Sequence, residues 1–129
     1  MLKHHLKTHH KILKYKLQLS KLTSIQYHKT EVRAFSNPPR LVFIVMKAIG
    51  ILLGQQSTEW KDCKALLCRP NFIELLLNLD LEAIPESQVT KLKQFVQKEE
   101  LTPENVKLIS IAAGQLAKFI CLFIELREC

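Results

Sequence analysis

Apolar residues recur at helical spacing through the middle of the chain. After the break at Asn37-Pro38-Pro39, one face collects Leu41, Val42, Val45, Ala48, Ile49, Leu52 and Leu53. This i, i+3, i+4 pattern is typical of an amphipathic α-helix. Proline favours the first helical position, and glycine favours the position just past the last turn. The pattern therefore predicts a helix that starts at Pro39, is capped by Gly54 and lies at the centre of the core.

Three shorter helices are expected to follow. Ser57 or Thr58 caps the second helix, Pro70 separates it from a third over Phe72–Leu79, and Pro85 opens a fourth. Their apolar faces are Trp60, Leu66 and Leu67 in the second helix and Val89, Leu92 and Phe95 in the fourth. With 3 Gly in the chain, few tight turns are encoded. The sequence predicts an all-α cluster of five to six helices.

The last helix has the strongest start signal. Thr102 is expected to cap it, Pro103 takes the first position, and Glu104 places negative charge at the positive end of the dipole. A helix of about 26 residues, at ~1.5 Å rise per residue, would extend ~39 Å and leave the domain as an arm. We expect its apolar stripe, Leu116–Leu126, to fray or to self-associate because it has little to pack on.

Residues 1–33 form a basic extension to a domain over residues 34–129. The extension holds eight of the 19 Lys and Arg residues, one of the 12 acids and all 5 His, so the rest of the chain is neutral. Residues 2–29 contain no Gly or Pro and are compatible with a helix. Two short apolar stripes run along it without the sustained heptads of a coiled coil: Leu6, Leu13 and Leu17, and Ile12, Tyr15, Leu19 and Leu22. The extension is either a solvated segment or an arm that binds polyanions.

The sequence contains no catalytic constellation, and we expect no cofactor and no metal. Gly50 and Gly54 are not followed by the Lys-Ser/Thr of a phosphate-binding loop. The four Cys have no C-x-x-C spacing and are expected to be reduced thiols. The pairs His4-His5 and His9-His10 would bind a transition metal only adventitiously. The longest apolar stretch, Leu41–Leu53, is too short for a membrane span, which needs about 20 residues.

Seven elements in order resemble the stalk region of dynein heavy chains over residues 31–126. They are Ser36-Asn37-Pro38-Pro39, Leu52-Leu53-Gly54, Trp60, Asn71-Phe72, Ile84-Pro85, Thr102-Pro103-Glu104 and Ser110 to Ala113. In that family a helical tip joins an ascending and a descending stalk helix and binds microtubules. The resemblance implies that the last helix starts the descending arm, and that this chain is the stalk tip without the ATPase ring of the parent motor.

The resemblance also implies which residues contact tubulin. Arg69 stands at a commonly basic position of the family and Glu104 at an acidic one. Arg40 and Lys47 lie about one turn on either side of Phe43, and Lys107 is adjacent to Leu108. Two positions that are commonly basic in the family hold Phe43 and Leu108 here, so Phe43→Lys and Leu108→Arg are expected to strengthen binding. Contacts between basic side chains and an acidic polymer should weaken as salt increases.

Three functions follow from these observations. The first is a microtubule-binding stalk tip with tubulin and other dynein subunits as partners, located in the cytoplasm or cytoskeleton or in the cilium or axoneme. The second is a helical assembly fragment that has lost tubulin affinity. The third is polyanion binding through the basic extension, without specific recognition of nucleic acid.

Overall fold

The computed structural model describes residues 2–22, 32 and 34–128, with side chains from His9 onward in the first helix. These residues form seven α-helices and no strand, which confirms the predicted all-α fold. The helices are α1 (Leu2–Leu22), α3 (Arg40–Leu52), α4 (Trp60–Leu67), α5 (Phe72–Leu77), α6 (Glu86–Lys98), α7 (Pro103–Lys107) and α8 (Ile111–Arg127).

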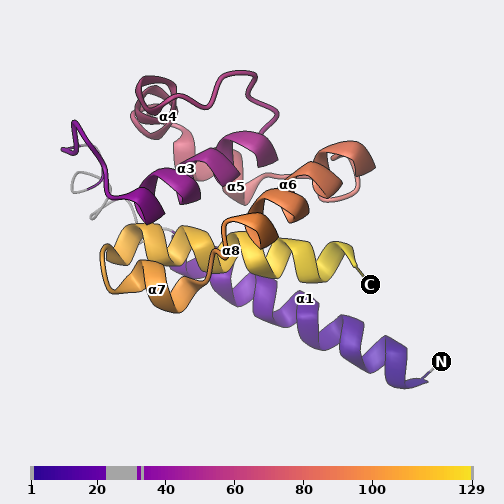
Figure 1. Ribbon diagram of the computed structural model, residues 1–129. Coiled ribbons are helices and arrows are strands. Elements are labelled where there is room, and N and C mark those ends of the chain that lie inside the picture. Colours follow the sequence, from indigo (N-terminus) through magenta and orange to yellow (C-terminus); the bar gives the residue numbers. More distant parts are fainter. Residues whose placement is uncertain (1, 23–31, 33, 129) are drawn as a thin grey trace.

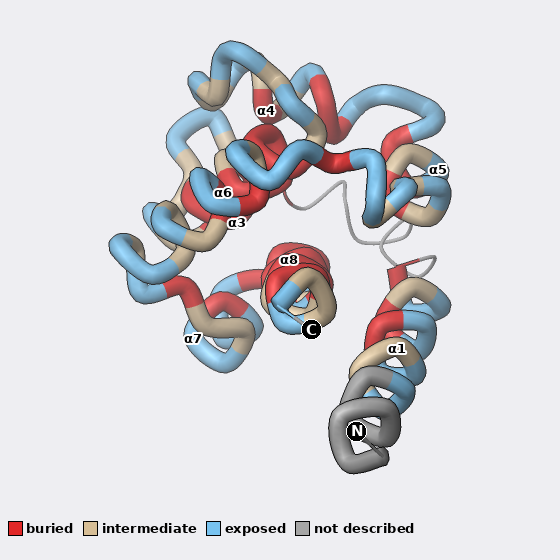
Figure 2. The backbone as a smooth tube through the Cα atoms, turned by 90° about the vertical axis from the view of Figure 1, so that its right-hand side faces the viewer, coloured by how far each residue is buried: buried red, intermediate tan, exposed pale blue. Residues whose placement is uncertain are grey.

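Helix α8 occupies the centre of the molecule. Viewed along its axis, α8 is surrounded by α3 and α6 on one side, α7 below and α1 on the other side (Figure 2). Phe119 and Phe123 are fully buried, and Leu126 is half-buried against the same core. The expectation that this stripe frays or self-associates was therefore wrong, because α1 covers the side of α8 that α3 and α6 leave open.

Helix α1 runs antiparallel to α8 (Figure 1). The Tyr15 ring lies 5.5 Å from the Phe119 ring, and the Gln18 side-chain amide donates hydrogen bonds to the Gln115 carbonyl (3.0 Å) and its Oε1 (2.8 Å). Tyr15, Gln18 and Leu22 are all buried. Residues 2–22 of the basic extension are thus helical, as the absence of Gly and Pro allowed. It packs on the rest of the chain as one half of a helical pair.

Helix α3 follows the predicted pattern closely. It begins at Arg40, one residue later than expected, with Pro39 as the preceding cap residue. At its other end Gly54 adopts a φ of +74°, and the Gln55 amide donates to the Gly50 carbonyl at 2.8 Å. A glycine adopts this left-handed conformation without strain. Nine of the thirteen α3 residues are buried, which confirms its predicted place in the core.

The predicted continuous last helix is two helices. Helix α7 ends at Lys107, and α8 begins after Ser110, whose hydroxyl accepts a hydrogen bond from the Ala113 amide at 3.2 Å. Thr102 caps α7 as predicted, by accepting from the Asn105 amide at 3.4 Å. Helix α7 folds back onto α8. At the point of contact, a β-carbon on Gly114 would lie only 2.9 Å from the Lys107 Cα.

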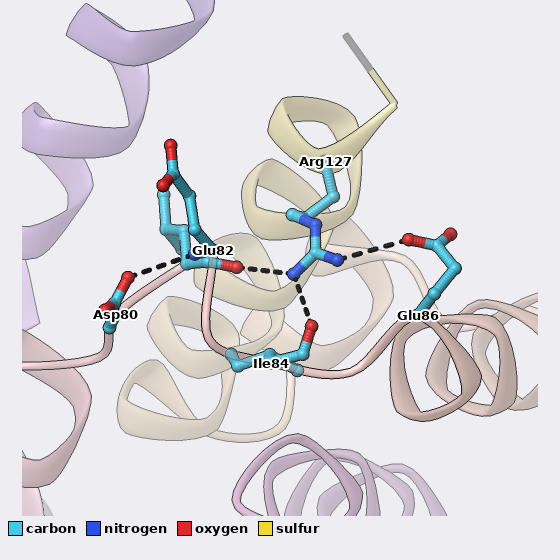
Figure 3. A network of polar contacts seen from close by, with 6 residues as sticks. Asp80, Glu82, Ile84, Glu86 and Arg127 are labelled. Carbon is cyan, nitrogen blue, oxygen red and sulfur yellow. Dashed lines mark hydrogen bonds and ion pairs between the residues drawn. The ribbon is translucent and has the colours of Figure 1, made fainter.

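The link between α5 and α6 is fastened to the end of α8 by one arginine. The Arg127 guanidinium donates to the Leu81 carbonyl (2.5 Å) and the Ile84 carbonyl (3.0 Å), and it forms an ion pair with Glu86 at 3.2 Å (Figure 3). Asp80 closes the preceding turn by accepting from the Glu82 amide at 3.1 Å. Charge-assisted hydrogen bonds are stronger than neutral ones. The end of α8 is therefore held in place at residues where fraying had been expected.

Smaller differences from the sequence reading concern helix ends. Glu59 precedes α4 in the cap position, instead of Ser57 or Thr58, and α5 ends at Leu77, two residues before the predicted Leu79. None of the described helices has the length and apolar character that crossing a bilayer requires. Burial raises the pKa of Cys63 and of Cys121 to about 11, which makes both thiols poor nucleophiles at neutral pH.

Candidate interaction surface

The first group of predicted contact residues lines a groove between α3 and α6. Arg40, Phe43 and Lys47 lie along its α3 side, and Phe95 and Glu99 along its α6 side. Arg40 forms an ion pair with Glu99 at 2.7 Å, although 67% of the Arg40 side chain stays exposed. An exposed pair of this kind contributes little to stability. Arg40 can therefore exchange Glu99 for an acidic group on a partner at small cost.

Phe43 has a packing role that its family position did not suggest. Its ring meets the Trp60 ring edge-on at a centroid distance of 5.7 Å, and the Lys47 ammonium lies 4.6 Å from the Phe43 ring centre. Trp60 is in turn fixed by a hydrogen bond from its Nε1 to the Phe35 carbonyl at 2.9 Å. Aromatic pairs and cation–π contacts each contribute about 0.5–1.5 kcal/mol. Phe43 thus joins α3 to α4 and orients Lys47, so a lysine at position 43 would remove structural contacts.

The second group lies on α7 and lines a different groove. Glu104 and Lys107 face Gly114 and Lys118 of α8 across a hollow of about 480 Å³ that also reaches Lys21 of α1. Glu104 and Lys107 are both exposed. The structure therefore divides the predicted contact residues between two grooves. The helices that carry them, α3 and α7, are in direct contact.

The turn between α7 and α8 is apolar and exposed. Leu108 is 85% exposed, and the neighbouring Ile109 and Ile111 are exposed as well. Single exposed apolar residues are common, but three in one turn form a small patch. The turn lies at the end of the α1–α8 pair opposite the two chain ends (Figure 1). We call Arg40, Lys47, Lys107 and Leu108 the tip surface.

Arg69 lies apart from the tip surface. It follows the end of α4 and is exposed. Both views place α4 and α7 on opposite sides of α3 (Figures 1 and 2). The structure therefore does not bring Arg69 together with Glu104 and Lys107.

Two features of the grooves were missed by the sequence reading. Glu99 neutralises part of the Arg40 charge, and Lys118 lines the same hollow as Lys107. Glu99 is far from Arg40 in sequence, and Lys118 lies on a different helix from Lys107. The pattern of helix faces in a sequence cannot show which helices meet. Within the described part of the chain, no group of three or more His, Cys, Asp or Glu side chains is placed to hold a metal ion. The side chains of His4 and His5, and all of His28, lie outside that part.

Comparison with protein families gives a match over almost the whole chain. Residues 9–129 match the family described as the microtubule-binding stalk of dynein motor. The match begins inside α1, so it includes most of the helix that pairs with α8.

Individual relatives are dynein heavy chains. The chain is 37% identical over 90 residues to human dynein axonemal heavy chain 14 and 33% identical over 105 residues to human dynein axonemal heavy chain 10. It is 33% identical over 97 residues to the cytoplasmic dynein heavy chain of Drosophila melanogaster. These alignments cover 70%, 81% and 74% of this chain, which spans 2% of the length of each relative.

The fold is also found in a solved structure, the microtubule binding domain of dynein-C. The two structures superimpose with a TM-score of 0.74 at 21% sequence identity, over 94% of this chain and 89% of the other. At this identity the likeness concerns the fold: a helical pair that ends in a cluster of short helices.

Proposed function

Since the chain belongs to the microtubule-binding stalk family of dynein motors, we propose that it binds microtubules through the tip surface on α3 and the α7–α8 turn. The contact between α3 and α7, at the end of the helical pair away from both termini, is the observation that supports this proposal best. Lys47 and Lys107 supply positive charge to an acidic polymer, and Arg40 adds a third cation when Glu99 releases it.

Arg69 and Glu104 have less support as contacts. Arg69 follows α4, on the other side of α3 from α7, and would reach only a partner that extends around α3. Glu104 lines the α7 groove beside Lys107 and lowers the net positive charge there. We propose that Glu104 tunes the charge of the surface, and that Arg69 contributes less than Lys47 or Lys107.

In a complete heavy chain this segment would act as the track-binding end of a motor. The chain spans only 2% of its relatives, so the ATPase and the other dynein subunits belong to a larger assembly. The relatives include axonemal and cytoplasmic dyneins. We propose a location on the cytoskeleton, in the cytoplasm or in a cilium, and no catalysis by this segment itself.

The proposed contact is tested by reversing the two lysines of the tip surface. We expect Lys47→Glu with Lys107→Glu to weaken cosedimentation with stabilised microtubules by at least about tenfold, because each exposed charge pair is worth about 0.2–1 kcal/mol and reversal also adds repulsion. The matched control is Lys61→Glu with Lys91→Glu, which makes the same change in net charge on α4 and α6. Equal losses in the two variants would show that net charge, and not the tip surface, governs binding.

Leu108 offers a second test, because it is exposed where the family commonly has a basic residue. We expect Leu108→Arg to strengthen microtubule binding by up to about fivefold, and to leave thermal stability unchanged, because the side chain has few contacts to lose. The gain should shrink as salt increases. Phe43→Lys is the contrasting change: it should lower stability, because the Trp60 contact is lost.

The apolar turn favours one alternative. Leu108, Ile109 and Ile111 place apolar surface where charge would attract tubulin, so the segment would be a helical assembly module with little tubulin affinity. If wild-type protein fails to pellet with microtubules at low salt while Leu108→Arg pellets saturably, this alternative replaces the first proposal.

A further inference from the structure

Two adjoining hollows follow the seam between α1 and α8. One hollow, of about 240 Å³, is lined by Lys14, Leu17, Gln18, Lys21, Lys118 and Leu122. The hollow beside α7, of about 480 Å³, shares Lys21 and Lys118 with it. Because they share two lysines, the two hollows adjoin, and we call them together the α1–α8 groove. Each has room for side chains of a bound ligand. The groove runs from the α7–α8 turn toward the middle of α1.

The walls of this groove carry one sign of charge almost throughout. Among the residues that the structure describes, four lysines line it (Lys14, Lys21, Lys107 and Lys118) and one carboxylate, that of Glu104. Lys14 and Lys118 lie on facing helices and both are exposed, and no acidic side chain of the described residues lines the hollow between them. Like charges placed this close repel one another and attract an anionic partner.

The groove also has an apolar component. Leu17 is 61% exposed although it lines the hollow, and Leu122 opposite it is half-buried. Lys14, Leu17, Gln18 and Lys21 follow one another at i, i+3, i+4 and i+7, so they form one face of α1. An exposed leucine between lysines fits a ligand that carries both acidic and apolar side chains.

From this arrangement we propose that the α1–α8 groove binds an acidic peptide segment with interspersed apolar residues. A peptide fits better than a nucleic acid, because none of the described residues that line the groove is aromatic and could stack on bases. It fits better than a membrane surface, because the lysines border a hollow between two helices, whereas interfacial helices insert a protruding apolar face. The groove shares Lys107 with the tip surface, but Lys14, Leu17 and Lys118 lie outside that surface, so variants at these three residues test the groove separately.

The test measures binding of a fluorescein-labelled peptide of the repeat Glu-Gly-Glu-Leu to the full chain by fluorescence anisotropy. We expect saturable binding that Lys14→Glu with Lys118→Glu weakens by about tenfold, on the same scale as two exposed charge pairs. Lys61→Glu with Lys91→Glu should leave it within about twofold, and Leu17→Ser, or a peptide with Ser in place of Leu, should weaken it about threefold. The pair Lys14→Gln with Lys118→Gln removes the two charges without reversing them, so it serves as a control for misfolding of the charge-reversal variant.

Several results would overturn the proposal. They are the absence of saturable binding, an equal loss in the groove and control variants, or tighter binding of anionic vesicles or single-stranded nucleic acid than of the peptide. Microtubule cosedimentation separates this proposal from the first one. The Lys47 and Lys107 reversal should reduce pelleting whether or not the peptide binds, and the Lys14 and Lys118 reversal should weaken peptide binding about tenfold whether or not microtubules pellet.

Discussion

Gly114→Val is expected to destabilise the protein by about 3 kcal/mol, at the upper end of the usual cost of overpacking. A β-carbon at this position would lie 2.9 Å from the Lys107 Cα and 3.0 Å from its Cβ. Because backbone atoms lie on the other side, the contact cannot be relieved by rotating a flexible side chain. Helix α7 would have to move away from α8. Urea unfolding followed by circular dichroism measures the stability loss.

Alanine at the two helical glycines provides the control. Both changes gain about 1 kcal/mol of helix propensity. At Gly50 the new β-carbon would meet only the Thr58 methyl group, at 3.2 Å, so Gly50→Ala should be neutral or stabilising. Gly114→Ala should be destabilising by about 1–2 kcal/mol despite the same gain. If the two alanine variants were equally stable, close packing of α7 on α8 would not be what requires glycine at position 114.

The same substitution links the fold to the proposed function. Helix α7 carries Lys107, and the exposed Leu108 follows it directly. Displacing α7 should therefore reduce microtubule binding even under conditions in which the Gly114→Val protein stays folded. The close approach of α7 to α8, which positions Lys107, thus depends on a glycine at position 114.

Helix starts were predictable where a residue has one dominant local role. Thr102-Pro103-Glu104 marked the start of α7, and Gly54 marked the end of α3, because caps and left-handed positions depend on the residues nearby. The break at Ser110 was not predictable in this way. Ser110-Ile111-Ala112-Ala113 reads equally well as helix interior, and the cap forms because α7 folds back onto Gly114. A tertiary contact thus decided where the helix starts.

The packing of α1 on α8 could not be predicted from the sequence, for a related reason. Of the two stripes on residues 2–22, the one that contains Tyr15 and Leu22 is packed, while Leu13 and Leu17 are exposed. The packed stripe is short, and the buried position between Tyr15 and Leu22 is a glutamine, Gln18, which a search for apolar heptads passes over. The Gln18 side-chain nitrogen is paired with Gln115 of the partner helix, while the Gln18 Oε1 is buried without a hydrogen-bond partner among the described residues.

The candidate site shows the same division. Arg40 and Lys107 are exposed and Lys47 is half-buried, and their places beside basic positions of the family made them candidates. Two other features depend on which helices touch. They are the contact of the Phe43 ring with Trp60 and the ion pair of Arg40 with Glu99. Side-chain identity therefore indicated what the surface could bind, while the helix contacts determined which of its charges are available.

Removing α1, by truncation to residues 34–129, is expected to abolish cooperative unfolding or to convert the monomer into an aggregate. The truncation uncovers the side of α8 on which Phe119 packs against Tyr15. It also removes the buried Tyr15 and Leu22. Each large apolar side chain that loses its burial costs about 1.5–3 kcal/mol, so several together approach the total stability of a small domain, about 5–15 kcal/mol.

The control for this truncation changes the other face of the same helix. Leu13→Ser with Leu17→Ser alters two exposed leucines and should leave the free energy of unfolding within about 0.5 kcal/mol of the wild-type value. Hydrogen exchange after residue 118 should be slow in the full chain and fast in the truncation. If the truncated chain were monomeric, cooperative and protected there, residues 34–129 would form an independent domain, and the pairing of α1 with α8 would be dispensable. The buried Gln18–Gln115 contact argues against that outcome. Burying the Gln18 amide costs free energy that its hydrogen bonds to Gln115 offset, and these bonds form only when α1 packs on α8.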